Sequence, residues 1–501
     1  MSSILYHSMN PSKLTYAFIF CFLFSCTKPQ EIVFKENNLE QYRPEYHFSP
    51  AKGWMNDPNG MIYIDGEYHL FFQHYPDSTV WGPMHWGHAK SSNLLDWEEL
   101  PIAIYPDSLG YIFSGSAVYD QENSSGLGTP ENPPLVAIFT YHHMDGERSG
   151  KTDFQCQGIA FSLDKGKTWE KFSGNPVLPN QGIKDFRDPK VRKIKNSDGK
   201  DVWIMTLAAW NQVQFYQSEN LIEWKLAGEF GKEVGAHGGV WECPDLIPMK
   251  APNGQTKWIL LVSINPGGPQ KGSATQYFIG NFKDGHYSPD DTMIRWLDYG
   301  PDNYAGVTWS NLPESQERNL FIGWMSNWLY AQVVPTQSWR SAMTIPRELS
   351  LIDIDGTLLV KSAPAREITD QRKETFEVSG NVSKLPGTAF ELTAEVENDF
   401  SLVFRNELGE NVSITREMGL ITIDRSRSGK SDFHRDFAAV HSAPMSWEVN
   451  SIRIFMDASS IELFVNEGDI VMTSLLFPST PYKTLELISG VKNAELHRLK
   501  K

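Results

Sequence analysis

The chain has 501 residues, enough for about two to four domains of ordinary size. Its formal net charge of -16 makes nucleic acid and anionic membrane surfaces poor candidates for partners. Aromatic residues make up 12% of the chain and 16 of them are tryptophan. That composition suits an all-β core and also suits stacking on sugars, so a neutral ligand fits but is not selected.

Residues 1–25 are predicted to be an export signal and not part of the fold. Leu14 to Phe24 is an apolar run of 11 residues, too short to span a bilayer. It ends in Ser25-Cys26, a sequence that resembles the lipobox of bacterial lipoproteins. The resemblance implies cleavage before Cys26, lipidation of its thiol and anchorage in the bacterial envelope, on the periplasmic face or the cell surface. Plain secretion with an incidental cysteine is the alternative. Residues 26–44 are predicted to be a polar tether.

The rest of the chain has no pattern typical of metal or redox chemistry. Cys156 and Cys243 are too few for a disulfide framework. No cysteine and histidine cluster has the spacing of a zinc site, and the pair His142-His143 is predicted to be structural. There is also no glycine-rich motif that would cradle a phosphate.

From about residue 45 the chain repeats one unit five times, each opening with polar turn chemistry and running into an apolar hairpin. The openings at 57, 114, 188, 242 and 304 are spaced by 57, 74, 54 and 62 residues. That length suits a four-stranded antiparallel sheet, and no stretch shows a long helical pattern. The sequence therefore predicts an all-β fold with a five-bladed β-propeller over residues 45–350.

The first opening is the most distinctive, Trp54-Met55-Asn56-Asp57-Pro58-Asn59-Gly60. Proline fixes φ, and asparagine and glycine accept positive φ, so the motif predicts a turn that carries Asp57 directly before a strand. The residues that follow, 61–72, are predicted to form a hairpin that turns at Asp65-Gly66.

The composition changes after Leu349, since Trp447 is the only tryptophan beyond it. Residues 351–376 are polar and are predicted to be a linker. Residues 377–501 alternate strands with turns and are predicted to form a β-sandwich with one face solvated. That domain carries no concentrated site motif, so a stabilising role is favoured over carbohydrate binding.

In a propeller the innermost strand of each blade lines the central axis, so equivalent positions converge at one end of the channel. The repeat therefore predicts one pocket that contains Asp57, Ser114, Asp188, Glu242 and the segment 302–309. Three of the five openings carry a carboxylate close to a proline. A purely structural propeller has no reason to gather like charges, because they repel and raise one another's pKa.

Two carboxylates that flank a glycosidic bond are the parts of a retaining glycosidase. One attacks the anomeric carbon, and the other protonates the leaving oxygen and then activates water. Glu242 has the apolar neighbours expected of an acid whose pKa is raised. Asp57 has polar neighbours that keep a nucleophile ionised. Asp188, beside Arg187, is suited to gripping sugar hydroxyls.

These motifs resemble those of glycoside hydrolase family 32, the β-fructosidases (invertases, inulinases and levanases), over roughly residues 45–500. The resemblance implies a five-bladed propeller followed by a β-sandwich, with no cofactor. It implies that Asp57 attacks C2 of a fructosyl unit, that Asp188 stabilises the transition state and that Glu242 is the acid/base. The implied substrate contacts are Asn56, Gln73, Trp81, Phe113, Ser114, Arg187, Trp309 and Trp324.

The predicted activity is release of terminal β-D-fructofuranosyl units from fructans or sucrose by double displacement. Exo action is favoured, because tryptophan-rich loops at 81–86 and 324–328 would close the pocket around a chain end. A fructosyltransferase or an endo-fructanase would use the same three carboxylates. A non-catalytic fructan-binding lipoprotein is the alternative from another class. The linkage, β2,1 or β2,6, and the oligomeric state are left open.

Overall fold

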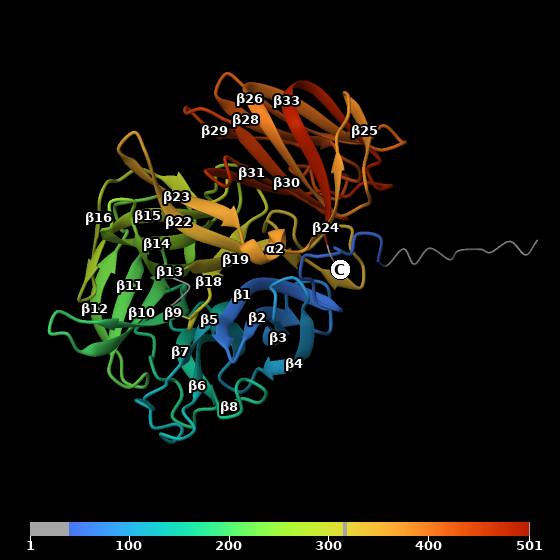
Figure 1. Cartoon of the computed structure of the whole chain (residues 1–501). Helices are drawn as coiled ribbons and strands as arrows, with labels where there is room; N and C mark the ends of the chain where they lie inside the picture. The colour runs from blue at the N-terminus through green and yellow to red at the C-terminus, as the bar shows by residue number, and fades with distance from the viewer. Residues whose placement is uncertain (1–39, 314–317, 500–501) are drawn as a thin grey trace, which may run out of the picture. The chain divides into compact units, whose positions relative to one another are not determined.

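The computed structural model describes residues 40–313 and 318–499 (Figure 1). Within these ranges nearly all regular structure is β-strand, and the two helices, α1 (Met144–Arg148) and α2 (Arg366–Thr369), are short. No helix in the described part of the chain is long and apolar enough to cross a membrane. The predicted signal peptide, Cys26 and most of the tether 26–44 lie outside the described residues.

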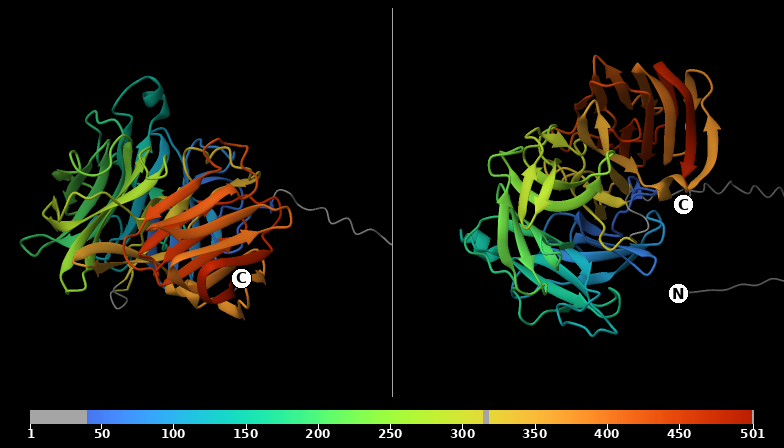
Figure 2. Two further views of the ribbon diagram at one scale, coloured as in Figure 1. Left: turned by 90° about the horizontal axis from the view of Figure 1, so that it is seen from above. Right: turned by 60° about the vertical axis from the view of Figure 1, so that its left-hand side comes forward.

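Five antiparallel sheets form the predicted β-propeller (Figures 1 and 2). In each, the first strand in the sequence is the innermost, and the following strands pair outward in chain order, except that β17 pairs with β15 and β21 pairs with β19. The strands are β1 (Gly53–Ile64), β2 (Glu67–Tyr75), β3 (His85–Ser91) and β4 (Glu98–Ile104) in blade 1; β5 (Tyr111–Tyr119), β6 (Leu135–His142), β7 (Gln155–Ser162) and β8 (Glu170–Lys171) in blade 2; β9 (Phe186–Lys195), β10 (Asp201–Ala209), β11 (Val213–Ser218) and β12 (Lys225–Phe230) in blade 3; β13 (Val240–Lys250), β14 (Thr256–Asn265), β15 (Ala274–Lys283), β16 (His286–Pro289) and β17 (Arg295–Trp296) in blade 4; and β18 (Tyr304–Thr308), β19 (Asn319–Met325), β21 (Ala342–Met343), β22 (Arg347–Ile354) and β23 (Thr357–Pro364) in blade 5.

The ring is closed by a strand that returns to blade 1 from the last part of the propeller. β20 (Trp339–Arg340) pairs in parallel with the start of β1. A second contact joins blade 5 to blade 1, where the Tyr63 amide donates to the Ser310 carbonyl at 3.0 Å. The first and last parts of the propeller are therefore tied by main-chain bonds at both ends of β1.

Residues 351–376 were predicted to be a linker, but much of this segment belongs to the last blade of the propeller. β22 and β23 are the outer strands of blade 5, and α2 and β24 (Arg372–Glu377) follow them. The outer strands of a blade are half exposed, and buried and exposed residues alternate along β22. An outer strand is therefore as polar in composition as a linker, which is why composition alone misplaced the end of the propeller.

Every inner strand contains a β-bulge at the position where the sequence motif opens. Asp57 lies in the bulge Met55–Pro58, and the others lie at Ile112–Gly115, Arg187–Lys190, Glu242–Asp245 and Tyr304–Val307. The motif is thus not a turn before a strand, since β1 begins at Gly53 and runs through it. Proline has no N–H for the ladder, so these residues suit a bulge as well as a turn. A bulge bends the strand and re-aims its side chains, here toward the channel.

The C-terminal residues form a β-sandwich, coloured orange to red in Figure 2. Two 16-residue strands, β26 and β33, run through both layers: the first half of β26 pairs with β30, and the second half pairs with β27. Buried aliphatic and aromatic side chains fill the space between the layers. The remaining strands are β25 (Val382–Lys384), β26 (Phe390–Arg405), β27 (Asn411–Glu417), β28 (Leu420–Arg427), β29 (Val440–Pro444), β30 (Ser451–Asp457), β31 (Ser460–Val465), β32 (Ile470–Leu475) and β33 (Thr484–Leu499).

Buried ion pairs join the sandwich to the propeller. The Arg347 guanidinium contacts Asp298 at 2.9 Å and Glu462 at 2.5 Å, and all three side chains are almost fully buried. Arg425 of the sandwich contacts Asp302 at 2.6 Å. Asp302 was predicted to face the pocket; instead its carboxylate is committed to the domain interface, where it also accepts from the Leu475 amide. Charges buried this deeply are stable only when paired, so the two domains depend on each other.

Candidate active site

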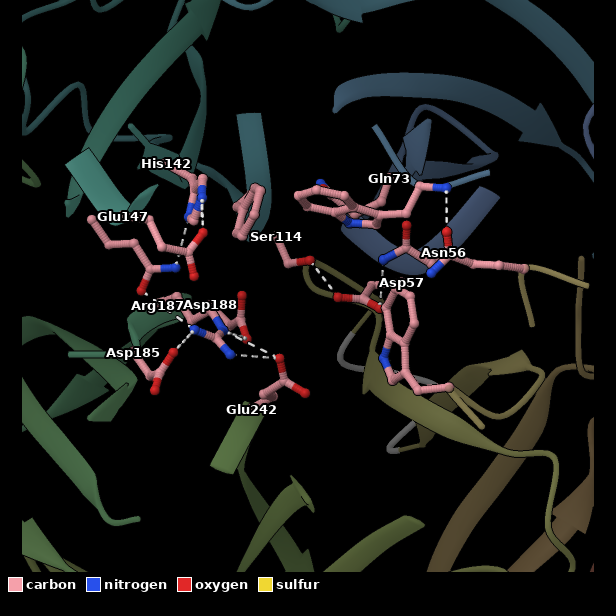
Figure 3. Close-up of a pocket in the computed structure, with 15 residues that line it drawn as sticks. Asn56, Asp57, Gln73, Ser114, His142, Glu147, Asp185, Arg187, Asp188 and Glu242 are labelled. Atoms are coloured by element: carbon pink, nitrogen blue, oxygen red, sulfur yellow. Dashed lines mark hydrogen bonds and ion pairs between the residues drawn. The ribbon is translucent and has the colours of Figure 1, made fainter. Parts of the chain in front are cut away.

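A pocket of about 270 Å³ lies at the end of the channel where the five bulges meet (Figure 3). Its volume is close to the lower end of the range of sites that hold small ligands, about 300 Å³. Four of the five blades contribute their inner strands to its wall, and loops complete the rim. It is lined by Asn56, Asp57, Gln73, Trp81, Phe113, Ser114, His142, Glu147, Gln155, Asp185, Arg187, Asp188, Glu242, Trp328 and Gln332.

Asp57 is held by two hydrogen bonds from its neighbours. Ser114 Oγ donates to Oδ2 at 2.6 Å, and Asn56 Nδ2 donates to Oδ1 at 3.0 Å. The Asn56 amide is itself oriented, because Trp54 Nε1 donates to its oxygen at 2.7 Å. Burial and the nearby Glu242 charge raise the pKa of Asp57, and these hydrogen bonds oppose the rise. The carboxylate is therefore fixed in orientation and reachable from the pocket.

Asp188 has a strained backbone, with φ at 65°, in the bulge of β9. Its amide donates to Thr140 Oγ1 at 3.0 Å, and its Oδ2 accepts from the Cys243 amide at 3.0 Å. Such backbone conformations are rare and cost free energy. They persist where many surrounding contacts hold the residue in place, and they cluster at functional sites. Burial raises the pKa of Asp188 to about 7, with Arg187 opposing the rise and Glu242 adding to it.

Glu242 accepts hydrogen bonds from one residue of each neighbouring blade. Both of these residues lie in the bulge of their blade's inner strand. Arg187 donates to Oε1 from Nη2 at 2.9 Å and from Nε at 3.2 Å, and the Tyr304 hydroxyl donates to Oε2. Arg187 also donates from Nη1 to Asp185 at 2.7 Å. Surrounding carboxylates raise the pKa of Arg187, although burial alone would lower it, so it stays cationic. The Arg187 guanidinium therefore holds both Glu242 and Asp185 in place on the acidic side of the pocket (Figure 3).

Cys243 packs as a neutral thiol between two of the acids. Its Sγ lies 3.6 Å from both Asp57 Oδ2 and Asp188 Oδ2. Burial, followed by the charges of Asp188 and Asp57, raises the pKa of Cys243 well above its usual range. It is a free cysteine, as is Cys156.

The opposite wall is aromatic. The Phe113 ring stacks on His142 with centroids 4.2 Å apart, and the Trp81 ring meets Phe113 edge-on at 6.0 Å. Gln73 Nε2 is buried and has no hydrogen-bond partner among the described residues. A buried amide donor at a pocket wall is costly unless a ligand or water accepts from it. Aromatic faces beside polar groups suit a sugar, which has apolar faces and hydroxyl edges.

Of the implied substrate contacts, six line the pocket and two do not. Asn56, Gln73, Trp81, Phe113, Ser114 and Arg187 all line it. Trp309 is buried in the propeller core, where its Nε1 donates to the His69 carbonyl at 3.0 Å. Trp324 is fully buried and packs against Trp54, with ring centroids 6.1 Å apart. Both therefore act as packing residues behind the pocket, and Trp328 is the tryptophan of that loop that reaches the wall.

Several residues that line the pocket were not predicted from the sequence. His142 was predicted to be structural, yet it lines the pocket, where its Nε2 lies 3.1 Å from Glu147 Oε2. Burial and Arg187 lower the pKa of His142 to about 3, so it is neutral. Glu147, Gln155, Asp185 and Gln332 also lie outside the repeated motifs. Asp185 could have been found from its spacing, two residues before Arg187.

Within residues 40–313 and 318–499, no three histidine, cysteine or acidic side chains are grouped as a metal site. Five carboxylates and one arginine line the pocket opposite the aromatic wall, and three of the carboxylates, Asp57, Asp188 and Glu242, come from the inner strands of different blades. A propeller pocket with these groups is that of a glycosidase, in which carboxylates attack and protonate a glycosidic bond.

Comparison with known families confirms that class and narrows it. The model of the glycosyl hydrolases family 32 N-terminal domain matches residues 47–362, and that of the family 32 C-terminal domain matches residues 359–500. The chain therefore belongs to glycosyl hydrolases family 32, as its motifs indicated.

Two curated relatives and two solved structures show how much of the chain is shared. A levanase of Bacillus subtilis is 44% identical over 92% of this chain and 71% of its own length. An extracellular exo-inulinase of Aspergillus awamori is 38% identical over 90% of this chain and 92% of its own. The crystal structure of exo-inulinase from Aspergillus awamori superposes with a TM-score of 0.82 at 33% identity, covering 92% of this chain and 98% of that one. A family 32 β-fructofuranosidase of Bombyx mori gives a TM-score of 0.74 at 30% identity, with 92% and 95% covered. The chain is thus a family 32 glycosidase of the β-fructosidase type.

Proposed function

We propose that this enzyme releases terminal fructosyl units by a retaining mechanism with Asp57 as nucleophile, Glu242 as acid/base and Asp188 as transition-state stabiliser. The proposal rests on the observation that the carboxylates surround one pocket but are held in place by different kinds of neighbouring group (Figure 3). Asp57 is positioned by hydrogen bonds from neutral groups, whereas Glu242 is positioned by Arg187 and Tyr304. Separate environments give two carboxylates separate roles.

In the first step an Asp57 oxygen attacks C2 of the fructosyl unit, and the bond from C2 to the leaving oxygen breaks. Glu242 gives its proton to that oxygen, so the leaving sugar departs as a neutral alcohol. The product is an ester between Asp57 and fructose. In the second step Glu242 takes a proton from water, the water oxygen attacks C2, and the ester bond returns its electrons to Asp57.

Asp188 and Arg187 serve the charged transition state. The fructosyl unit develops positive charge at C2, and an ionised carboxylate that binds its hydroxyls stabilises it. Burial raises the pKa of Asp188 to about 7. The hydrogen bond from the Cys243 amide, at 3.0 Å, lowers that pKa and holds the ionised carboxylate in place. Arg187 spans Glu242 and Asp185, so it offsets the negative charge of the pocket without closing it.

We further propose exo action on a fructan chain end or on sucrose. The relatives named levanase and exo-inulinase support a fructan, and the pocket is bounded at its rim by Trp81, Trp328 and Gln332. A pocket bounded on several sides suits a chain end better than a polymer that runs through. A fructosyltransferase, an endo-fructanase and a fructan-binding lipoprotein are the competing assignments.

The test is a product profile on sucrose, inulin and levan, using protein that lacks residues 1–25, with Asp57→Asn as the inactive control. Free fructose from the earliest times supports exo-hydrolysis, and the relative rates identify the linkage. A ladder of short oligosaccharides would instead establish endo action, and products longer than the substrate would establish transfer. Turnover of none of the three by the wild-type protein would refute the enzyme and favour a binding protein.

We also propose that the protein is exported and anchored by a lipid on Cys26. The apolar run before Cys26 supports this, as do relatives named extracellular. The experiment compares detergent-phase partitioning of the full chain with that of Cys26→Ser, both expressed in a bacterium that processes lipoproteins. Partitioning that is lost in the variant supports the anchor, and equal partitioning of both proteins would exclude it.

A further inference from the structure

One tryptophan differs from all the others in its surroundings. All 16 tryptophans lie within the described residues, and Trp210 alone among them is exposed, at 56%. Tryptophan is the largest apolar side chain and is highly buried on average. An exposed indole therefore needs an explanation other than the packing of the propeller.

Trp210 lies at the tip of the hairpin between β10 and β11, at the pocket end of blade 3. β10 ends beside the start of β9, where Ala209 pairs with Phe186 and Ala208 pairs with Arg187. The Trp210 amide donates to the Asp185 carbonyl at 2.9 Å, and its carbonyl accepts from the Trp241 amide at 2.8 Å. Its backbone therefore bridges the two strands that carry Arg187 and Glu242.

The backbone of Trp210 is held in an unusual conformation. Its φ is 63°, in the left-handed region that bulky side chains rarely adopt. Glycine or asparagine is the ordinary choice for such a corner. Because both of its main-chain groups are bonded to pocket strands, the residue is fixed in place while its indole stays in solvent.

Trp210 lies on the side of the pocket where the leaving group would bind, and not on the side of the fructosyl unit. Glu242, as the acid, must contact the leaving oxygen, so the departing part of the substrate lies on the Glu242 side. Trp210 is joined to Trp241, the residue before Glu242. It does not line the pocket itself. Only a substrate that extends beyond the pocket on the leaving side can reach its indole.

We propose that the Trp210 indole is a stacking platform for sugar units of a fructan chain beyond the first unit on the leaving side. The inference rests on the proposed function and deepens it, because it assigns an oligomeric or polymeric fructan as the preferred substrate over sucrose. Sucrose contributes a single leaving sugar, which ends before the platform. The Trp210 ring is exposed on a backbone that hydrogen bonds hold in place, and an aromatic face of this kind suits stacking on the apolar face of a sugar.

The experiment compares Trp210→Ala and Trp210→Phe with wild type on sucrose and on inulin and levan oligosaccharides of increasing length. Leu226→Ala is the matched control, because Leu226 is 54% exposed on β12 of the same blade. For Trp210→Ala we expect kcat/KM on sucrose within about twofold of wild type. On the longer oligosaccharides we expect a loss of about three- to tenfold, mainly through KM, with Trp210→Phe between the two.

Three results would overturn the platform. Equal losses on sucrose and on long chains would show a structural effect, or a contact with the first leaving sugar. Unchanged chain-length dependence in Trp210→Ala would show that the indole binds no substrate. A loss of the same size in Leu226→Ala would show that the effect is not specific to the rim. If wild-type protein turns over no fructosyl substrate, the proposed function fails first; if it turns them over and only the Trp210 results fail, the function stands.

Discussion

Replacing Arg187 by lysine tests the organisation of the acidic side of the pocket. Arg187 makes two bonds to one Glu242 oxygen, at 2.9 Å and 3.2 Å, while a third nitrogen reaches Asp185 at 2.7 Å. A lysine keeps the charge but cannot span two carboxylates in this way. Hydrogen bonds to charged groups contribute about 1.5–3 kcal/mol each. Because both bonds end on one oxygen, we count about 3 kcal/mol for the pair, a loss of about 150-fold in kcat/KM.

The assay compares sucrose with an activated aryl β-fructofuranoside. The aryl leaving group needs little protonation, so it reports on Asp57 without the acid. If Arg187 acts by positioning Glu242, the loss on sucrose is about 150-fold and that on the aryl substrate is less than about tenfold. Thermal unfolding of Arg187→Lys serves as the folding control, and we expect a midpoint near that of wild type.

Two results would refute this reasoning. A loss below about fivefold on sucrose would show that the paired bonds do not position the acid. An equal loss on both substrates would show that Arg187 acts on the fructosyl unit or on the fold, and not on protonation of the leaving group.

Three further predictions concern pH and stability. Ser114→Ala removes a donor that lowers the pKa of Asp57, which burial already raises, so the acidic limb of the kcat/KM profile moves to higher pH. Arg347→Met leaves the buried Asp298 without its guanidinium partner and leaves Glu462 with His47 alone, and urea unfolding should show a loss of about 3–5 kcal/mol. Burial alone would lower the pKa of His47, but the hydrogen bonds that its ring donates to the Asp457 and Glu462 carboxylates raise it to about 9. Since this folded pKa lies above the unfolded value of 6.5, the stabilisation is complete below pH 6.5 and is lost by pH 9, about 3 kcal/mol in all.

Each of these has a contradicting outcome. A profile of Ser114→Ala that keeps its acidic limb would mean that Asp57 does not set that limb. An Arg347→Met protein as stable as wild type would show that the buried pair contributes no net stability. His47→Gln should abolish the loss of stability between pH 6.5 and pH 9, so a loss of the same size in that variant would trace it to other groups.

The repeat made the three carboxylates predictable. Asp57, Asp188 and Glu242 occur at equivalent points of a unit that recurs down the chain, and a ring of such units must bring them together. The resemblance to family 32 then indicated the reaction, and the matching domain models confirm the family. These predictions depended on periodicity, which is a property of the whole chain and survives errors in any one element.

Other features could not be read from the sequence, for physical reasons. Trp309 and Trp324 lie near the motifs, but an aromatic residue beside a pocket can face the core or the ligand, and packing decides which. Asp302 lies in a motif shared with Tyr304, yet its partner, Arg425, is in the other domain, 123 residues away. The end of blade 5 was misplaced because a half-exposed outer strand and a linker have similar compositions.

The central claim is that Asp57 forms an ester with fructose, and trapping that ester is its most direct test. In Glu242→Gln an activated aryl β-fructofuranoside can still react with Asp57, but the base that activates water is missing, so the intermediate should accumulate. Intact and peptide mass spectrometry should then show one added fructosyl unit on the peptide that contains Asp57. A fructosyl unit on another residue would contradict the account, as would release of the aryl group with no covalent intermediate at any time.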